Sequence, residues 1–175
     1  MKNIIFDRSG TLMDNLTPVY EASMILFEQL GHDRITLDEY KRNNISPYMK
    51  FWNKYFPNLT AEQQNEMFSN AIQKVKQPTL YPYVHDVLQK LHKDGCKIIL
   101  LSSQPTEELL SKCQENNIQQ TFDGIIGDIH DKKEVISDIL EKYHLDPSHT
   151  LFVGDTNYEV EVGKYAGLIT VALSR

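Results

Sequence analysis

The sequence predicts an α/β protein, and two observations carry that prediction. In the second half of this 175-residue chain, short apolar runs alternate with helical patterns, which is typical of a mostly parallel sheet covered by helices. Between about Asp14 and Thr79 the alternation stops, because that stretch has helical patterns and no convincing strand. We therefore expect one core domain, 1–13 with 80–175, and a small helical unit, 14–79, inserted after the first strand.

Five apolar runs predict the strands. Each is compact and ends in turn or polar residues, as expected of strands buried on both faces. Four are clear, and the fifth, Ile125-Ile126, is shorter; the four are Ile4–Phe6, Ile98–Leu101, Leu151–Val153 and Leu168–Leu173.

Helical patterns lie between the later strands, at Val84–His92, Glu107–Cys113, Val135–Tyr143 and Tyr158–Tyr165. Strands and helices alternating at this spacing predict a Rossmann-like, three-layer core.

The insert has its own helix signals. A hydroxyl at Thr17 followed by Pro18 predicts a helix start, and Gly31 predicts its end. Apolar residues on one face of this helix are Val19, Ala22, Leu26 and Leu30. Further helices are expected at Leu37–Arg42, Pro47–Phe56 and Ala61–Lys76. The aromatic-rich stretch "PYMKFWNKYF" favours packing within the insert over substrate contact.

Composition excludes several classes of protein. With 41% hydrophobic and 24% charged residues, the chain has the balance of a globular protein. Its formal net charge of -6 gives no general attraction to nucleic acid or anionic lipid. No apolar run is long enough to span a membrane and no signal peptide is evident, so we expect a cytoplasmic protein. Cys96 and Cys113 are too few for a disulfide framework and are expected to be buried free thiols.

Polar residues directly follow three of the predicted strands. Asp7, Ser102, Ser103 and Asp155 would meet at one edge of a parallel sheet, where ligands of such sheets bind. Taken singly, the aspartates are typical of turns, and the serines are typical of N-caps for a helix starting near Pro105. Their convergence is the main functional signal.

Two carboxylates at this edge, Asp7 and Asp155, would repel each other unless a cation lies between them. Such oxygen ligands suit Mg²⁺. Glu159 follows Asp155 by four residues and can orient the site. Lys132 or Lys133, at the start of another helix, could neutralise an anion, although alone they are typical of a solvated face.

Four segments resemble the motifs of the haloacid dehalogenase-like (HAD) superfamily, in the same order. They are "IIFDRSGTL", "IILLSSQP", "DKKEVI" and "LFVGDTNYEVEVGKYAG", and the resemblance runs from Ile4 to Thr170. The insert falls where that family has a small cap. The line "YPYVHDVLQKLHKDGCKIILLSS" resembles phosphoglycolate-phosphatase-like members.

The resemblance implies roles for individual residues. Asp7 would be the nucleophile that forms an aspartyl-phosphate, and Ser102 would hydrogen-bond the phosphoryl group. Lys132 matches the motif III lysine by its spacing to the following apolar residues, and Lys133 is the alternative. Asp155 and Glu159 match the acidic pair of motif IV. The implied Mg²⁺ ligands are Asp7, Ser9, Asp155 and Glu159.

One position departs from the family's phosphatases. They carry a second aspartate two residues after the nucleophile, where it acts as acid and base, and here that position is Ser9. A serine hydroxyl is no general base near neutral pH, and such catalysis is worth about 10² to 10⁴ in rate. We therefore expect reduced turnover.

Three groups of HAD relatives also lack the second aspartate at this position, and each suggests a different activity. The P-type ATPases have a similar Asp-Lys-Thr-Gly-Thr pattern, but nothing else in this chain resembles an ion pump. Phosphonoacetaldehyde hydrolases have alanine there and a cap lysine, for which Lys41, Lys50 and Lys54 are candidates. Haloacid dehalogenases work without metal but usually lack the acidic pair that Asp155 and Glu159 preserve.

The function expected from all this is a Mg²⁺-dependent hydrolase of a small phosphorylated or phosphono metabolite. The alternatives are a catalytically weak or inactive HAD-fold binding or regulatory protein, favoured by Ser9, and a hydrolase of C–P bonds. A flavodoxin-like nucleotide-binding protein lacks support, because no glycine-rich phosphate loop follows the first strand. The sequence leaves the substrate and the oligomeric state open.

Overall fold

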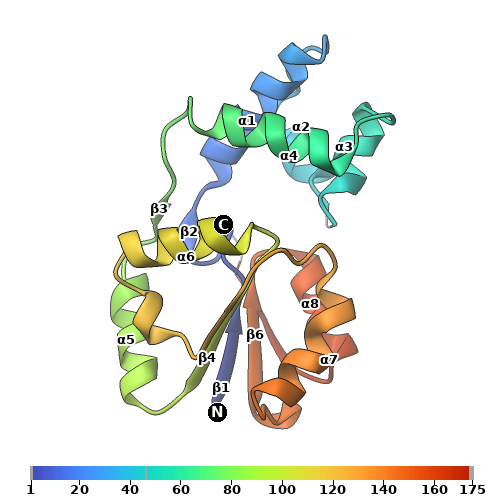
Figure 1. Ribbon diagram of the computed structural model, residues 1–175. Coiled ribbons are helices and arrows are strands. Elements are labelled where there is room, and N and C mark those ends of the chain that lie inside the picture. The colour runs from blue at the N-terminus through green and yellow to red at the C-terminus, as the bar shows by residue number, and fades with distance from the viewer. Residues whose placement is uncertain (1, 46, 174–175) are drawn as a thin grey trace. The chain divides into compact units, whose positions relative to one another are not determined.

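The computed structural model describes residues 2–45 and 47–173, so residues 1, 46, 174 and 175 of the predicted units lie outside it. Within the described ranges it contains seven strands and eight α-helices (Figure 1). In chain order they are β1 (Asn3–Phe6), β2 (Met13–Asp14), α1 (Leu16–Gln29), α2 (Leu37–Asn43), α3 (Met49–Tyr55), α4 (Ala61–Ile72), β3 (Thr79–Leu80), α5 (Val84–Lys93), β4 (Lys97–Leu101), α6 (Thr106–Glu115), β5 (Gly124–Ile126), α7 (Lys132–Lys142), β6 (Thr150–Gly154), α8 (Asn157–Tyr165) and β7 (Ile169–Ala172).

Five of the described strands form one sheet in the order β5-β4-β1-β6-β7, and each neighbouring pair is parallel. All five predicted strands are therefore confirmed, and so is the α/β fold class. In the central strand, Phe6 is aligned with Leu100 of β4 on one side and with Val153 of β6 on the other.

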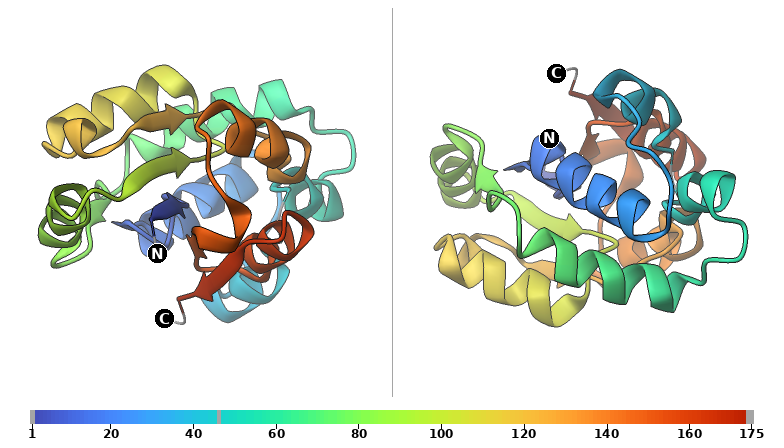
Figure 2. Two further views of the ribbon diagram at one scale, coloured as in Figure 1. Left: turned by 90° about the horizontal axis from the view of Figure 1, so that it is seen from below. Right: turned by 90° about the horizontal axis from the view of Figure 1, so that it is seen from above.

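Apolar side chains cover both faces of the sheet, because successive residues of a strand point in opposite directions. On one face Ile4 and Phe6 pack with Leu88 of α5 and Leu109 of α6. On the other face Ile5 packs with buried apolar side chains of α7 and α8, which are Ile136, Ile139 and Val162. Figure 2 shows these two helix pairs on opposite sides of the sheet. This burial on both faces explains why each strand is a continuous apolar run.

The chain divides into two compact units, one formed by the residues through Asp14 together with those from Leu80 onward, and the other by Asn15–Thr79. The second unit contains α1 to α4. Its core is aromatic: the Phe27 ring lies 5.0 Å from the rings of Tyr55 and Phe56, centroid to centroid, and Phe51 and Trp52 are buried beside it. The expected packing of the aromatic stretch within the insert is confirmed.

Two predictions for the insert were wrong. The helix α1 begins at Leu16 with Asn15 at the N-cap, so Thr17 is not the cap and Pro18 lies inside the first turn, where a missing N–H costs little. The expected end at Gly31 is confirmed by its left-handed φ of 75° just after the C-cap. The insert is also not free of strand, because Asp14 and Thr79 belong to the two-residue strands β2 and β3, which pair with each other.

Two further findings concern solvent and membranes. Cys113 is a buried free thiol as expected, whereas Cys96 is only half-buried, which corrects the prediction for that residue. Among the described helices, none has the length and apolar character needed to cross a bilayer.

Candidate active site

The sheet topology places the site between β1 and β6. From β1 the chain goes on to β4 on one side, and from β6 it goes on to β7 on the other. The carboxyl ends of two such strands, whose connections leave in opposite directions, form the ligand-binding crevice of open parallel sheets. Asp7 directly follows β1. By the strand register, Ser102 and Asp155 lie one residue further along the two flanking strands.

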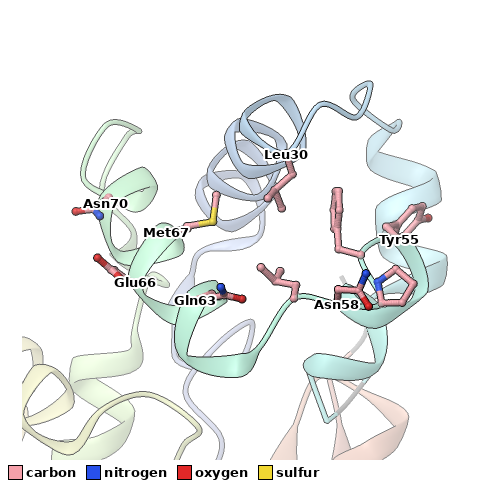
Figure 3. A pocket seen from close by; sticks show the side chains of 10 residues that line it. Leu30, Tyr55, Asn58, Gln63, Glu66, Met67 and Asn70 are labelled. Atoms are coloured by element: carbon pink, nitrogen blue, oxygen red, sulfur yellow. The ribbon is translucent and has the colours of Figure 1, made fainter.

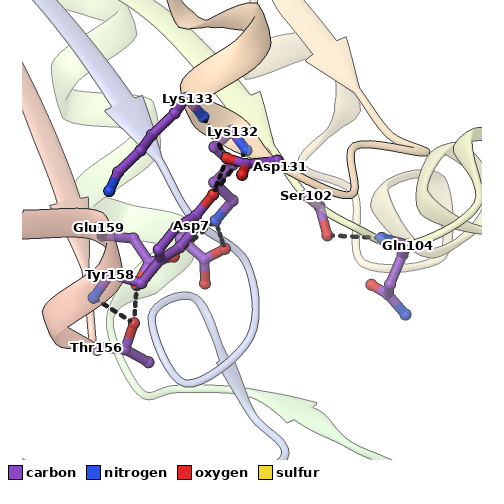
Figure 4. A network of polar contacts seen from close by, with 9 residues as sticks. All are labelled: Asp7, Ser102, Gln104, Asp131, Lys132, Lys133, Thr156, Tyr158 and Glu159. Carbon is purple, nitrogen blue, oxygen red and sulfur yellow. Dashed lines mark hydrogen bonds and ion pairs between the residues drawn. The ribbon is translucent and has the colours of Figure 1, made fainter. Parts of the chain in front are cut away.

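A buried lysine connects two carboxylates at this edge. Lys132 Nζ donates to Asp7 Oδ1 at 2.5 Å and to Glu159 Oε1 at 2.9 Å (Figure 4). The relative exposures of the three residues are 7% for Asp7 and 5% for both Lys132 and Glu159, so the ion pairs are shielded from water. An ammonium group has three donor hydrogens, and the two carboxylates take two of them.

Neighbouring helix residues fix the position of Lys132. Its backbone N–H donates to the Tyr158 hydroxyl at 3.0 Å, which in turn donates to Asp131. Asp131 is the N-cap of α7 and accepts from the Lys133 N–H at 2.9 Å. Burial, with the Asp131 hydrogen bond adding to it, raises the pKa of Tyr158 to about 12, so this hydroxyl keeps its proton.

Lys133 points elsewhere. Its ammonium pairs with Glu161 at 3.0 Å, and both of these side chains are partly exposed. Of the two lysines that the sequence left as alternatives, Lys132 therefore lies beside Asp7.

Both carboxylate oxygens of Glu159 accept hydrogen bonds from other side chains. Besides Lys132, the Thr156 hydroxyl donates to its second oxygen, and Thr156 is also the N-cap of α8. Burial by itself would raise the pKa of Glu159, but the Lys132 charge and these hydrogen bonds outweigh it and hold the pKa below its ordinary value. Glu159 is therefore held as an anion.

The pKa values of the other two acidic residues, Asp7 and Asp155, are raised. Burial raises the pKa of Asp7, Lys132 opposes the rise, and Glu159 adds to it. Asp155 reaches solvent, yet partial burial together with the charges of Asp7 and Glu159 raises its pKa to about 7. Burial contributes most to this rise, and the part due to Asp7 and Glu159 is repulsion between negative charges, which a cation would relieve.

A tight loop follows Asp7. The Arg8 carbonyl accepts N–H groups from Leu12 at 2.9 Å and Met13 at 3.0 Å, and Gly10 has a φ of 69°. A Cβ atom at Gly10 would lie 1.9 Å from Asp155 Oδ2, so only glycine allows the loop to approach that carboxylate. Ser9 is exposed in this loop.

Ser102 is buried and belongs to a separate set of contacts. Its hydroxyl oxygen accepts from the Gln104 N–H at 3.2 Å, and Figure 4 draws this pair apart from the Asp7 network. Neither Ser102 nor Ser103 caps the next helix, because α6 has Pro105 at its N-cap and no side-chain cap. The alternative interpretation of these serines as helix caps is therefore wrong.

Among the described residues, no group of three or more His, Cys, Asp or Glu side chains is arranged to hold a metal ion. Mg²⁺ needs fewer, since it takes one or two carboxylates and fills its other positions with water or phosphate oxygens. The Asp7 charge contributes to raising the pKa of Asp155, so these two carboxylates lie close enough to fit that requirement. The donor set is therefore compatible with Mg²⁺.

A pocket lies elsewhere, within the helical unit (Figure 3). Its volume is about 590 Å³, and apolar and amide side chains dominate its lining, which consists of Leu30, Tyr55, Phe56, Pro57, Asn58, Leu59, Gln63, Glu66, Met67 and Asn70. No residue of the sheet-edge cluster contributes to it, so it is not the site of the chemistry predicted from the sequence.

The fold and the cluster define a class: a parallel α/β protein with an acidic, lysine-bridged site at its topological switch point. The chain belongs to the haloacid dehalogenase-like hydrolase family, whose model matches residues 4–173. It is a HAD-family hydrolase.

Individual known proteins are also similar to this chain. It is 23% identical to a phosphoglycolate phosphatase of Aliivibrio fischeri, covering 99% of this chain and 84% of that protein. It is 28% identical to a phosphoglycolate phosphatase of Aquifex aeolicus, covering 97% and 83%. Among solved structures, a predicted phosphoglycolate phosphatase from Haemophilus somnus has a TM-score of 0.80 at 19% identity, covering 98% of this chain and 84% of that one. A haloacid dehalogenase-like hydrolase from Streptococcus pneumoniae has a TM-score of 0.78 at 21% identity, with coverages of 98% and 84%.

Sequence reasoning missed four residues that support the site. Asp131 and Thr156 precede helical runs, and their N-cap chemistry was a usable signal. Tyr158 had no such signal, because its partner Asp131 is 27 residues away in the chain. The same holds for Arg8, which reaches Gln104 across 96 residues.

Proposed function

We propose that this protein is a Mg²⁺-dependent phosphatase of a small phosphorylated metabolite, with Asp7 as the nucleophile. The observation that supports this most directly is the buried Lys132 ammonium between Asp7 and Glu159. The relatives' names suggest a phosphorylated carboxylic acid of the phosphoglycolate kind as the first substrate to test.

In the first step an Asp7 oxygen attacks phosphorus and the bond from phosphorus to the leaving oxygen breaks, which leaves an aspartyl-phosphate. Phosphoryl transfer depends mainly on positioning and on stabilising the charge of the equatorial oxygens. The third Lys132 hydrogen and the Ser102 hydroxyl would donate to those oxygens. Mg²⁺, held by Asp7, Asp155 and the Ser9 carbonyl, would supply further positive charge when bound.

Glu159 has a supporting role in this proposal. The motif pattern includes it among the metal ligands, but both of its oxygens accept protein hydrogen bonds. We assign it to orienting Lys132 and to adding negative charge behind the metal site.

The second step, hydrolysis of the aspartyl-phosphate, needs a base for the attacking water. Ser9 cannot supply one near neutral pH, so this step and the protonation of poor leaving groups are the expected bottlenecks. Ser9 is also the feature that favours the second candidate, a HAD-fold binding or regulatory protein with little or no turnover. For C–P hydrolysis no feature selects a lysine; Lys54, for example, donates to Asn43 at 2.7 Å.

The test is a panel of phosphate esters and phosphonates, phosphoglycolate included, assayed with and without Mg²⁺. The wild type, Asp7→Asn and the exposed control Asp138→Asn are compared, and phosphorylated Asp7 is sought by mass spectrometry. Mg²⁺-dependent release of phosphate or labelling of Asp7, lost in Asp7→Asn and kept in Asp138→Asn, is the expected result. Mg²⁺ binding without turnover or labelling would favour the binding protein, and phosphonate cleavage would favour the C–P hydrolase.

A further inference from the structure

Arg8 is a buried cation next to the nucleophile. It directly follows Asp7, and its relative exposure is 5%. Its guanidinium donates to Gln104 Oε1, a neutral amide oxygen 96 residues away in the chain. In residues 2–45 and 47–173, no carboxylate lies within ion-pair distance of it. This hydrogen bond joins the loop after β1 to the loop after β4.

Packing alone does not explain a guanidinium at this place. Arg8 lines a narrow crevice with apolar side chains that include Leu12, Leu100 and Cys113. An apolar side chain of similar length would fill such a place without the cost of removing a charge from water. A polar role for Arg8 therefore has to be sought in its partner.

Gln104 is the residue that holds Ser102. Its backbone N–H donates to Ser102 Oγ at 3.2 Å, and its carbonyl accepts from the Asp128 N–H at 2.7 Å. Gly127 presses against the same backbone, since a Cβ atom there would lie 2.6 Å from the Gln104 oxygen. The backbone of Gln104 is thus held by its contacts with Asp128 and Gly127, and its side chain is held by Arg8.

The Ser102 hydroxyl has one hydrogen and accepts through its oxygen. Because the oxygen already accepts from Gln104, the direction left for the hydrogen depends on where Gln104 lies. We propose that Arg8 is a positioning residue, which aims the Ser102 hydroxyl at the phosphoryl group by fixing Gln104. This inference rests on the proposed function, in which Ser102 contacts that group.

The test is a double-mutant cycle read out by binding of inorganic phosphate in the presence of MgCl₂, measured by titration calorimetry. It compares the wild type, Arg8→Met, Ser102→Ala and the double variant. Arg8→Met keeps an unbranched apolar stem, shorter than that of arginine, and removes the guanidinium donors. Loss of one oriented hydrogen bond should weaken phosphate binding by about three- to tenfold in each single variant. If Arg8 acts through Ser102, the double variant binds no more weakly than Ser102→Ala.

Two controls separate positioning from general damage. Glu108→Gln removes only the charge of an exposed partner of the Gln104 amide, 3.4 Å away, and should leave phosphate binding within about twofold. Arg8→Lys retains a donor and should recover part of the loss. Thermal melts with matching transitions establish that each variant is folded.

The outcomes distinguish this inference from the proposed function. If the losses of Arg8→Met and Ser102→Ala multiply in the double variant, Arg8 acts independently of Ser102 and the inference is wrong, while Ser102 keeps its role. If Ser102→Ala alone leaves phosphate binding unchanged, the proposed role of Ser102 fails and the inference fails with it.

Discussion

Lys132 Nζ lies 2.5 Å from Asp7 Oδ1, although the two residues are 125 positions apart in the chain. The same nitrogen lies 2.9 Å from Glu159 Oε1, so one buried cation compensates two buried carboxylates. A buried charge that loses its partner is far more costly than an exposed one. The stability of the core domain and the charge state of Asp7, the proposed nucleophile, therefore depend on the same side chain.

Lys132→Met should be both inactive and less stable. Removing the ammonium leaves Asp7 and Glu159 buried without a counter-charge, which costs about 3 to 5 kcal/mol. We expect the free energy of unfolding at pH 7, measured with urea, to fall by that order, and phosphate release to fall below detection.

The matched control is Lys133→Met, one residue further along the same helix. Its pair with Glu161 is partly exposed, so the loss should stay under about 1 kcal/mol, with activity retained. Equal losses in the two variants would contradict the assignment of Lys132 to the site.

Asp155→Asn should abolish Mg²⁺ binding and leave the fold intact. The charges of Asp7 and Glu159 contribute to raising the pKa of Asp155 to about 7, so removing its charge relieves repulsion in the metal-free protein. Titration calorimetry should detect no Mg²⁺ binding, while the melting temperature without metal at pH 8 should be unchanged or higher. An Mg²⁺ affinity equal to that of the exposed control Asp138→Asn would end the assignment of the metal site.

Tyr40 should make the helical unit sensitive to alkali. Burial raises the pKa of Tyr40 from 10.0 to about 12. Above pH 10 the unfolded chain releases this proton, whereas the folded protein keeps it until about pH 12. The contribution of Tyr40 to the free energy of unfolding is therefore fully present below pH 10. It declines by up to about 2 to 3 kcal/mol as the pH rises to 12.

Tyr40→Phe removes this titration, so its free energy of unfolding should fall less steeply between pH 10 and pH 12 than that of the wild type. Tyr165→Phe changes an exposed tyrosine and should follow the wild-type curve. The comparison uses urea unfolding at each pH, and parallel curves for wild type and Tyr40→Phe would show that Tyr40 titrates normally.

The sheet was predictable because its strands are buried on both faces. A run such as Ile98–Leu101 must be apolar throughout to lie between two helix layers, and this makes it visible in the sequence. Helix starts were less certain. Asn15 and Thr17 are both good N-cap residues, and the choice between them depends on tertiary contacts that no local pattern contains.

The candidate site was likewise predictable only in part. Strand ends predicted that Asp7, Ser102 and Asp155 lie at one edge, because topology alone brings them there. The ion-pair and hydrogen-bond partners of these residues could not be predicted. Lys132 and Lys133 are adjacent in the sequence, yet they point in directions about 100° apart on a helix, and only the placement of α7 decides which one meets Asp7.

The last prediction concerns Ser9, which in the proposed function takes the place of a proton-transferring carboxyl group. Aryl phosphates such as p-nitrophenyl phosphate have a leaving group that needs little protonation, whereas alkyl phosphates need much. The wild type should therefore hydrolyse aryl phosphates slowly or accumulate phosphorylated Asp7, and it should act least on alkyl phosphates.

Ser9→Asp should raise turnover of alkyl phosphates more than turnover of aryl phosphates, by up to about 10² to 10⁴ for a fully effective acid and base. Ser9 is exposed, so the larger side chain has room. Ser9→Asn adds similar volume without a proton to exchange and should give no such gain. Both substrate types are measured at saturating Mg²⁺ for each variant. Fast alkyl phosphate hydrolysis by the wild type would contradict the prediction, because it would require another group to transfer the proton.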